Sequence, residues 1–182
     1  VAAEAEMLAV LEMAERTGDV NLRARCLTYL TIGYRQQERL ETVREYCARS
    51  LEAAEEAAMP EYIATAQANR AWVAWHEGDW PAVRRDGRAA LTLWRQLPEG
   101  HASAAFQWTA LFPLMAVALA AEHLPEAVDC ARTLLDPSQQ KLADGLTAVL
   151  ENAVTAWQQN QSQQARQSLV EAISLAQQTK FL

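Results

Sequence analysis

The sequence has little of what β-rich, disulfide-stabilised and membrane-spanning proteins need. Its 182 residues include only 6 glycines, 6 prolines and 3 cysteines, and phenylalanine and tyrosine are scarce. A chain rich in alanine and poor in β-branched and aromatic side chains favours helices and argues against an all-β fold. No apolar stretch reaches the ~18 residues typical of a membrane-spanning helix. A soluble all-α protein is therefore expected, with no membrane partner.

The cysteine pattern and the N-terminal residues indicate in which cellular compartment the protein is found. Cys26, Cys47 and Cys130 are scattered and form no CxxC pair, which argues against a disulfide framework and against a thiolate metal site. The stretch from Val1 to Arg16 carries four glutamates and no basic leader, so no signal peptide is predicted. Together these features predict a cytoplasmic location.

The charge balance limits the partners. The formal net charge is −7 and the isoelectric point is near 5.0, so the chain as a whole repels phosphate backbones and anionic lipid. The densest basic cluster is Arg84, Arg85 and Arg88, but Asp79 and Asp86 accompany it, as on a solvated helix face. No nucleic-acid partner is expected for this domain.

Sequence motifs for catalysis are missing. The chain has no HExxH, no GxSxG, no phosphate-binding loop and no GxGxxG. His76, His101 and His123 each lack a second histidine or cysteine at ligand spacing, so a metal site is not expected. The sequence predicts a protein that is not an enzyme, with no catalytic residues, no metal ligands and no cofactor.

Apolar residues recur at three- and four-residue spacing along almost the whole chain, with Gly, Pro and polar punctuation between them. This pattern predicts nine helices with short connections, over residues 2–17, 20–37, 40–58, 61–77, 80–96, 102–121, 124–135, 139–159 and 162–179.

The helices fall into similar pairs. The turns inside the pairs align at Glu38, Gly78, Glu122 and Asn160, at intervals of 40, 44 and 38 residues. Beyond each turn comes a residue small enough for close approach of two helices, namely Val43, Val83, Ala127 and Ala165. Four units with one shared pattern indicate a repeat protein.

The second unit resembles the tetratricopeptide repeat. It has the small, small, Gly-Asp-aromatic, small, Ala-Leu, Pro order of that family, at Ala71, Ala74, Gly78-Asp79-Trp80, Val83, Ala90-Leu91 and Pro98. The resemblance implies a right-handed α-solenoid of stacked antiparallel helix pairs, about four and a half repeats long. It implies one domain over residues 1–182, made of an orphan helix at 1–19 and repeats at 20–59, 60–98, 101–137 and 138–182.

The long intervals are similar to a subgroup with longer repeats. That subgroup occurs in bacterial transcription regulators similar to the maltose-system activator and in signalling nucleotidases and cyclases. The first helix has the character of a second helix without its partner, so we expect the chain to be part of a longer protein. Apolar stripes at both ends favour a homodimer through the ends, involving Met7, Leu8, Leu11, Leu169, Ile173 and Leu182.

In such an array the first helix of each pair lines a concave groove. Helical spacing predicts an exposed groove stripe that includes Arg25, Thr28, Ile32, Arg35, Asn69, Trp72, Trp75, His76, Phe112 and Trp157. Tryptophan offers a stiff apolar face with one N–H donor, and arginine can bind a carboxylate or phosphate with two hydrogen bonds. The other three tryptophans, Trp80, Trp94 and Trp108, are predicted to pack inside.

The sequence favours a non-catalytic repeat domain of a bacterial cytoplasmic signalling or transcription regulator. Its groove would bind a protein or peptide segment, or a small effector. The alternative is a purely structural, self-associating scaffold whose groove is closed by its own aromatic side chains.

Overall fold

The computed structural model describes residues 2–98 and 106–182, with the side chains from residue 4 onward. The described residues form nine α-helices and no strand. The helices are α1 (Ala2–Thr17), α2 (Val20–Gln36), α3 (Leu40–Glu56), α4 (Pro60–Glu77), α5 (Trp80–Arg95), α6 (Trp108–Ala120), α7 (Leu124–Leu134), α8 (Asp144–Gln158) and α9 (Ser162–Gln178). The prediction of an all-α fold is confirmed. His101 and the predicted helical residues 102–105 lie outside the described part of the chain.

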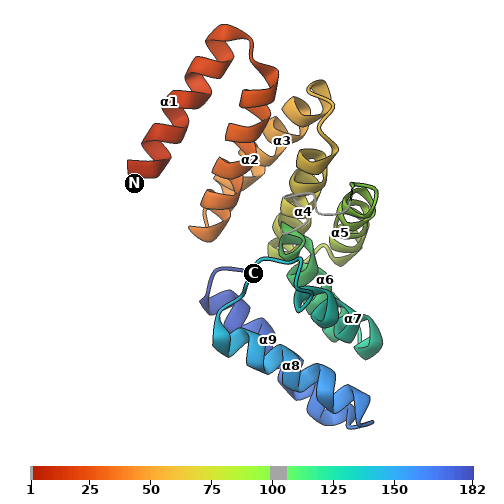
Figure 1. Ribbon diagram of the computed structural model, residues 1–182. Helices are drawn as coiled ribbons and strands as arrows, with labels where there is room; N and C mark the ends of the chain where they lie inside the picture. The colour runs from red at the N-terminus through yellow and green to blue at the C-terminus, as the bar shows by residue number, and fades with distance from the viewer. Residues whose placement is uncertain (1, 99–105) are drawn as a thin grey trace.

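Consecutive helices pack in pairs, α2 with α3, α4 with α5, α6 with α7 and α8 with α9 (Figure 1). The first helices also touch one another, α2 with α4 and α4 with α6, whereas α3, α5 and α7 make no comparable contact among themselves. A row of pairs whose first helices lie closer together curves toward that side. We call the α2, α4 and α6 side of the array the inner face.

The turn inside each pair has the same backbone conformation. The residue after the first helix has a positive φ in every pair, at 57° for Glu38, 75° for Gly78, 61° for Glu122 and 60° for Asn160. Only one of these residues is glycine, so the other three accept a left-handed conformation that side chains disfavour. The aligned turns of the sequence are thus real turns of one kind.

The small residues beyond these turns are completely buried where the two helices of each pair pack. Val43, Val83, Ala127 and Ala165 are all 0% exposed. A larger side chain at any of them would hold the two helices of its pair apart. The spacing of small residues in the sequence therefore marks where the two helices of each pair pack together.

Two helices begin later than predicted, because α6 begins at Trp108 although residues 106–107 were expected to be helical, and α8 also starts late. Residues 139–143 were expected to be helical, but α8 begins at Asp144. The carboxylate of Asp136 accepts hydrogen bonds from the backbone N–H of Ser138 at 2.8 Å and from its hydroxyl at 2.6 Å, which fixes a turn. Leu142 is then buried as part of an extended connection.

Several exposure predictions are wrong. Leu11, Leu169 and Leu182 are buried in the core, so the ends expose less apolar surface than the predicted stripes require. Met7, Leu8 and Ile173 are only partly buried against that core. Trp80, expected to pack inside, is 43% exposed, whereas Trp94 and Trp108 are buried as predicted. None of the described helices is long and apolar enough to span a membrane.

Alanine substitutions at two helical glycines should change the free energy of unfolding in opposite directions. A Cβ at Gly87 in α5 would lie 2.9 Å from Leu114 Cγ in α6, whereas a Cβ at Gly33 in α2 would meet nothing within 4 Å. Gly87→Ala should lower the free energy of unfolding by about 1–3 kcal/mol through overpacking. Gly33→Ala should raise it by up to about 1 kcal/mol through helix propensity. Urea denaturation followed by circular dichroism measures both, and equal effects would contradict the tight α5–α6 contact.

Candidate binding site on the inner face

A buried arginine occupies the centre of the inner face. Arg35, near the end of α2, is 1% exposed, and it forms no ion pair with any carboxylate of the described residues. Its Nη1 donates to the Thr109 carbonyl of α6 at 2.8 Å and more weakly to Oδ1 of Asn69 on α4 at 3.4 Å. Its Nη2 donates to the carbonyl of Phe181 at 2.8 Å. The guanidinium thus joins three helices and the segment after α9.

The Thr109 carbonyl is free for this contact because of a proline. In an α-helix the carbonyl of residue 109 accepts a hydrogen bond from the N–H of residue 113. Residue 113 is Pro113, which lies inside α6 and has no N–H to donate. Arg35 therefore supplies the donor that the helix itself lacks.

Two indole rings complete the surroundings of the guanidinium. The Arg35 Cζ lies 5.4 Å from the ring centroid of Trp72 and 5.1 Å from that of Trp108, within cation–π distance. Burial lowers the pKa of Arg35 to about 9, which still leaves the side chain charged at neutral pH. Carbonyl oxygens and ring faces replace both water and a counter-ion.

Hydrogen-bond donors remain unused in the same place. Arg35 Nε, Asn69 Nδ2 and Trp72 Nε1 are buried and have no partner within the described residues. All three are donors, so the groups that would complement them are acceptors such as carbonyl or carboxylate oxygens. We call Arg35, Asn69, Trp72, Trp108 and Phe181 the Arg35 cluster.

Phe181 reaches this cluster from the far end of the chain. Its ring lies edge-to-face on Trp108, with centroids 5.0 Å apart, and 5.9 Å from the ring of Phe112. Figure 1 shows the point marked C close to the ends of α2 and α6. Lys180 Nζ forms an ion pair at 2.6 Å with Oε2 of Glu38, just beyond α2. Residues 180–182 therefore lie across the inner face.

The structure brings together five of the predicted groove residues. Arg35, Asn69 and Trp72 belong to the cluster, Phe112 contacts Phe181, and the exposed His76 has its ring centroid 4.0 Å from that of Trp72. The prediction of an exposed stripe is wrong for the first four, which are buried because the inner face closes over them. Contact with a partner stays a prediction.

The other predicted residues lie apart from the cluster. Thr28 is buried between α2 and α3, where its hydroxyl lies 3.0 Å from that of Ser50, and Ile32 is also buried. Arg25 is exposed on α2. Trp75 and Trp157 are partly buried, and Trp75 contacts His76 with ring centroids 4.8 Å apart.

The sequence pattern did not identify two members of the cluster as site residues. Trp108 was assigned to packing, and its Nε1 does donate to Oε1 of Gln140 at 3.1 Å, although its ring also faces Arg35. Phe181 carries no local signal beyond an apolar pair after a glutamine-rich helix. The internal Pro113 is the sequence feature that marks a free carbonyl, and hence a place for an outside donor.

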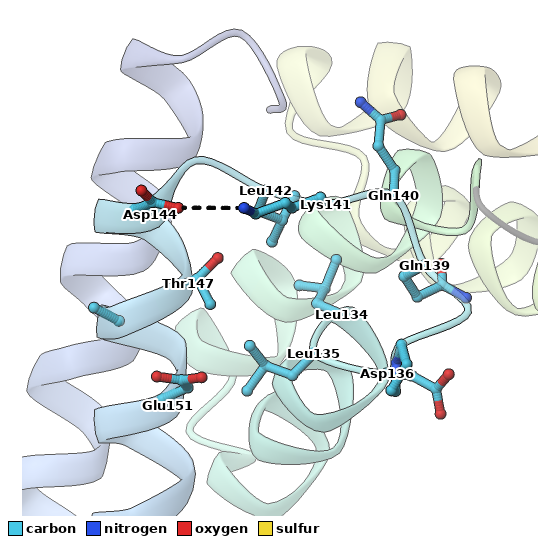
Figure 2. Close-up of a pocket in the computed structure, with 12 residues that line it drawn as sticks. Leu134, Leu135, Asp136, Gln139, Gln140, Lys141, Leu142, Asp144, Thr147 and Glu151 are labelled. Carbon is cyan, nitrogen blue, oxygen red and sulfur yellow. Dashed lines mark ion pairs between the residues drawn. The ribbon is translucent and has the colours of Figure 1, made fainter.

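A separate open cleft of about 390 Å³ lies between α8 and the connection after α7. Figure 2 shows Leu135 and Thr147 pointing into it from opposite sides, with Lys141 and Asp144 paired at its rim. Its lining mixes apolar side chains with exposed charges and gathers no group of convergent polar side chains. Among the described residues no group of His, Cys, Asp and Glu could hold a metal ion.

Comparison of the chain with protein-family models, with curated proteins and with solved structures finds no match.

The link between Pro113, Thr109 and Arg35 can be tested with a double-mutant cycle. Arg35→Lys should lower the free energy of unfolding by about 1–3 kcal/mol, because lysine cannot reach both carbonyls. The same change in a Pro113→Ala background should cost less, because the new N–H at residue 113 satisfies Thr109. Urea denaturation of the four proteins gives the coupling. Arg25→Lys, in the same helix but exposed, is the control, and an equal cost in both backgrounds would refute the link.

His76 should make stability depend on pH. His76 is exposed on one side, but the packing of its ring on Trp72 and Trp75 removes part of its hydration. This partial desolvation and, secondarily, the Arg35 guanidinium lower the pKa of His76 below its ordinary value near 6.5. The unfolded chain then binds a proton more readily than the folded chain, so this contribution is complete above pH ~6.5 and is lost as the pH falls from there to the folded pKa. Thermal unfolding at pH 7.5 and pH 5 should show a smaller drop in Tm for His76→Gln than for the wild type. His123→Gln, which removes an exposed histidine elsewhere, is the control, and equal drops in all three proteins would contradict the assignment.

Proposed function

We propose that this chain is a non-catalytic helical-repeat domain of a cytoplasmic regulator, similar to tetratricopeptide-repeat regions of bacterial signalling and transcription proteins. Its inner face binds a peptide segment of a partner protein. The observation that carries the proposal is the buried Arg35 guanidinium, which forms no ion pair with a carboxylate of the described residues. It lies within cation–π distance of two indole rings and donates to the backbone carbonyl of Phe181, which follows α9.

This arrangement has the chemistry of peptide recognition. A guanidinium and two rings bind a carbonyl group together with an aromatic or apolar side chain, and both are present in peptides of many sequences. Arg25 and the 44%-exposed Tyr29 both lie on α2. The Tyr29 ring is close to Phe106, with ring centroids 6.3 Å apart. These exposed groups extend the face beyond the buried cluster, so a longer segment has further contacts to make.

A closed scaffold is the second candidate. It is favoured by the burial of Arg35, Asn69, Trp72 and Phe112, which leaves the centre of the inner face filled by the chain itself. Under this reading the domain contacts partners, including a second copy of itself, through its helix ends. Sedimentation velocity over a range of concentrations would then show a reversible dimer.

An unbiased peptide library selected on the full chain separates the two candidates. Peptides that bind the inner face should lose at least about tenfold in affinity on Tyr29→Ala or Arg25→Glu, since both side chains are exposed and their removal leaves the core intact. Arg95→Glu, an equal charge change on the exposed side of α5, should leave affinity unchanged. Binding is measured by fluorescence anisotropy of labelled peptides.

Selected peptides that are insensitive to the α2 variants would count against the inner face. A library that yields no binder to a folded chain, together with a concentration-dependent dimer, would favour the closed scaffold.

A further inference from the structure

Residues 180–182 occupy the inner face in the way that a bound ligand would. Three consecutive side chains meet three different environments: Lys180 pairs with Glu38, the Phe181 ring packs on Trp108 and Phe112, and Leu182 is 4% exposed. The Phe181 carbonyl accepts from Arg35. The basic residue thus has an acidic partner and the aromatic residue has aromatic neighbours, while the aliphatic residue is buried in the hydrophobic core.

The backbone of this segment is held by its own helix. Lys180 has a φ of 65°, and the N–H groups of Phe181 and Leu182 both donate to the Ala176 carbonyl, at 2.8 and 3.1 Å. This turn at the end of α9 directs the segment, but it contributes none of the contacts to the inner face. Those contacts use only side chains and one carbonyl, so a separate peptide can supply them equally well.

The segment leaves part of the site unsatisfied. The three unpartnered donors of Arg35, Asn69 and Trp72 lie in the cluster that receives only one carbonyl from residues 180–182. A peptide brings one carbonyl for each residue, so a segment that continues across the face can satisfy donors that residues 180–182 leave unpaired. The cluster therefore has more hydrogen-bond donors than residues 180–182 have carbonyls to pair with them.

We propose that the inner face recognises peptide segments with a basic, an aromatic and an aliphatic residue in succession, and that residues 180–182 are its internal occupant. This inference rests on the proposed function and names the class of its ligand. A tethered segment acts at an effective concentration of the order of millimolar. A separate peptide consequently competes with it and binds the wild-type chain weakly.

The test uses the chain of residues 1–182 and a fluorescent peptide with the sequence of residues 178–182, acetylated and amidated. Phe181→Ala removes the central contact of the internal occupant, so the variant should bind this peptide at least about tenfold more tightly than the wild type does, because the tethered competitor is weakened. The same peptide with alanine in place of phenylalanine should not bind. Circular dichroism and urea denaturation establish that the variant is folded.

A milder variant keeps the proposal testable if Phe181→Ala does not fold. Lys180→Glu leaves the core intact and places two carboxylates together at Glu38, so peptide affinity should rise about two- to fivefold over the wild type. Lys141→Glu makes the same charge change at an exposed lysine that faces the separate cleft, and it should leave affinity unchanged.

A folded Phe181→Ala chain that binds the peptide no better than the wild type would overturn the proposal, and Phe181 would then be a packing residue only. The proposed function would survive that result if library peptides of other sequence still lose affinity on Tyr29→Ala. Loss of both signals would remove the inner face as a binding site altogether.

Discussion

The whole array depends on how it keeps one positive charge away from water. Moving a guanidinium into a protein interior costs several kcal/mol unless other polar groups replace its hydration. Here the replacements come from the carbonyls of Thr109 and Phe181, from Asn69 and from two indole rings. Asn69, Thr109 and Phe181 lie 34, 74 and 146 positions from Arg35 along the chain. The cluster is complete only when α2, α4, α6 and the end of α9 are all in place.

The repeated turns are the frame that makes this convergence possible. Four positive-φ residues, Glu38, Gly78, Glu122 and Asn160, reverse the chain in the same way, and a fully buried small residue follows each of them. Each unit therefore adds a helix pair, and the first helices of the first three pairs, α2, α4 and α6, lie on the inner face. Pro113 breaks the regularity at one place and exposes the carbonyl that Arg35 needs. The regular stacking of the pairs brings Arg35 close to α4 and α6, and Pro113 leaves the Thr109 carbonyl free to accept its hydrogen bond.

The residues that pack the centre of this face are the same ones that the proposed function assigns to recognition. A groove lined by aromatics and an uncompensated arginine would be costly if left dry and empty, because both the charge and the donors would lack partners. Residues 180–182 relieve that cost within the chain. A partner that displaces this segment must form hydrogen bonds that the segment does not form. The unpaired donors of Asn69 and Trp72 are available for such bonds. Under the proposed function, a closed face and a binding face are two states of one site.

The amino-acid sequence alone determined the local features. Helix period and turn residues placed the helices to within a few residues, except the starts of α6, at Trp108, and of α8, where the Asp136 turn delays the start to Asp144. These features follow from interactions between residues close in the chain. The same period put Arg35, Asn69 and Trp72 on one side of the first helices, but it could not show that they are buried. The burial of these three residues and the position of Phe181 beside Arg35 depend on how each helix pair is rotated relative to the one before it. These rotations add up along the array, and only the tertiary structure shows their total.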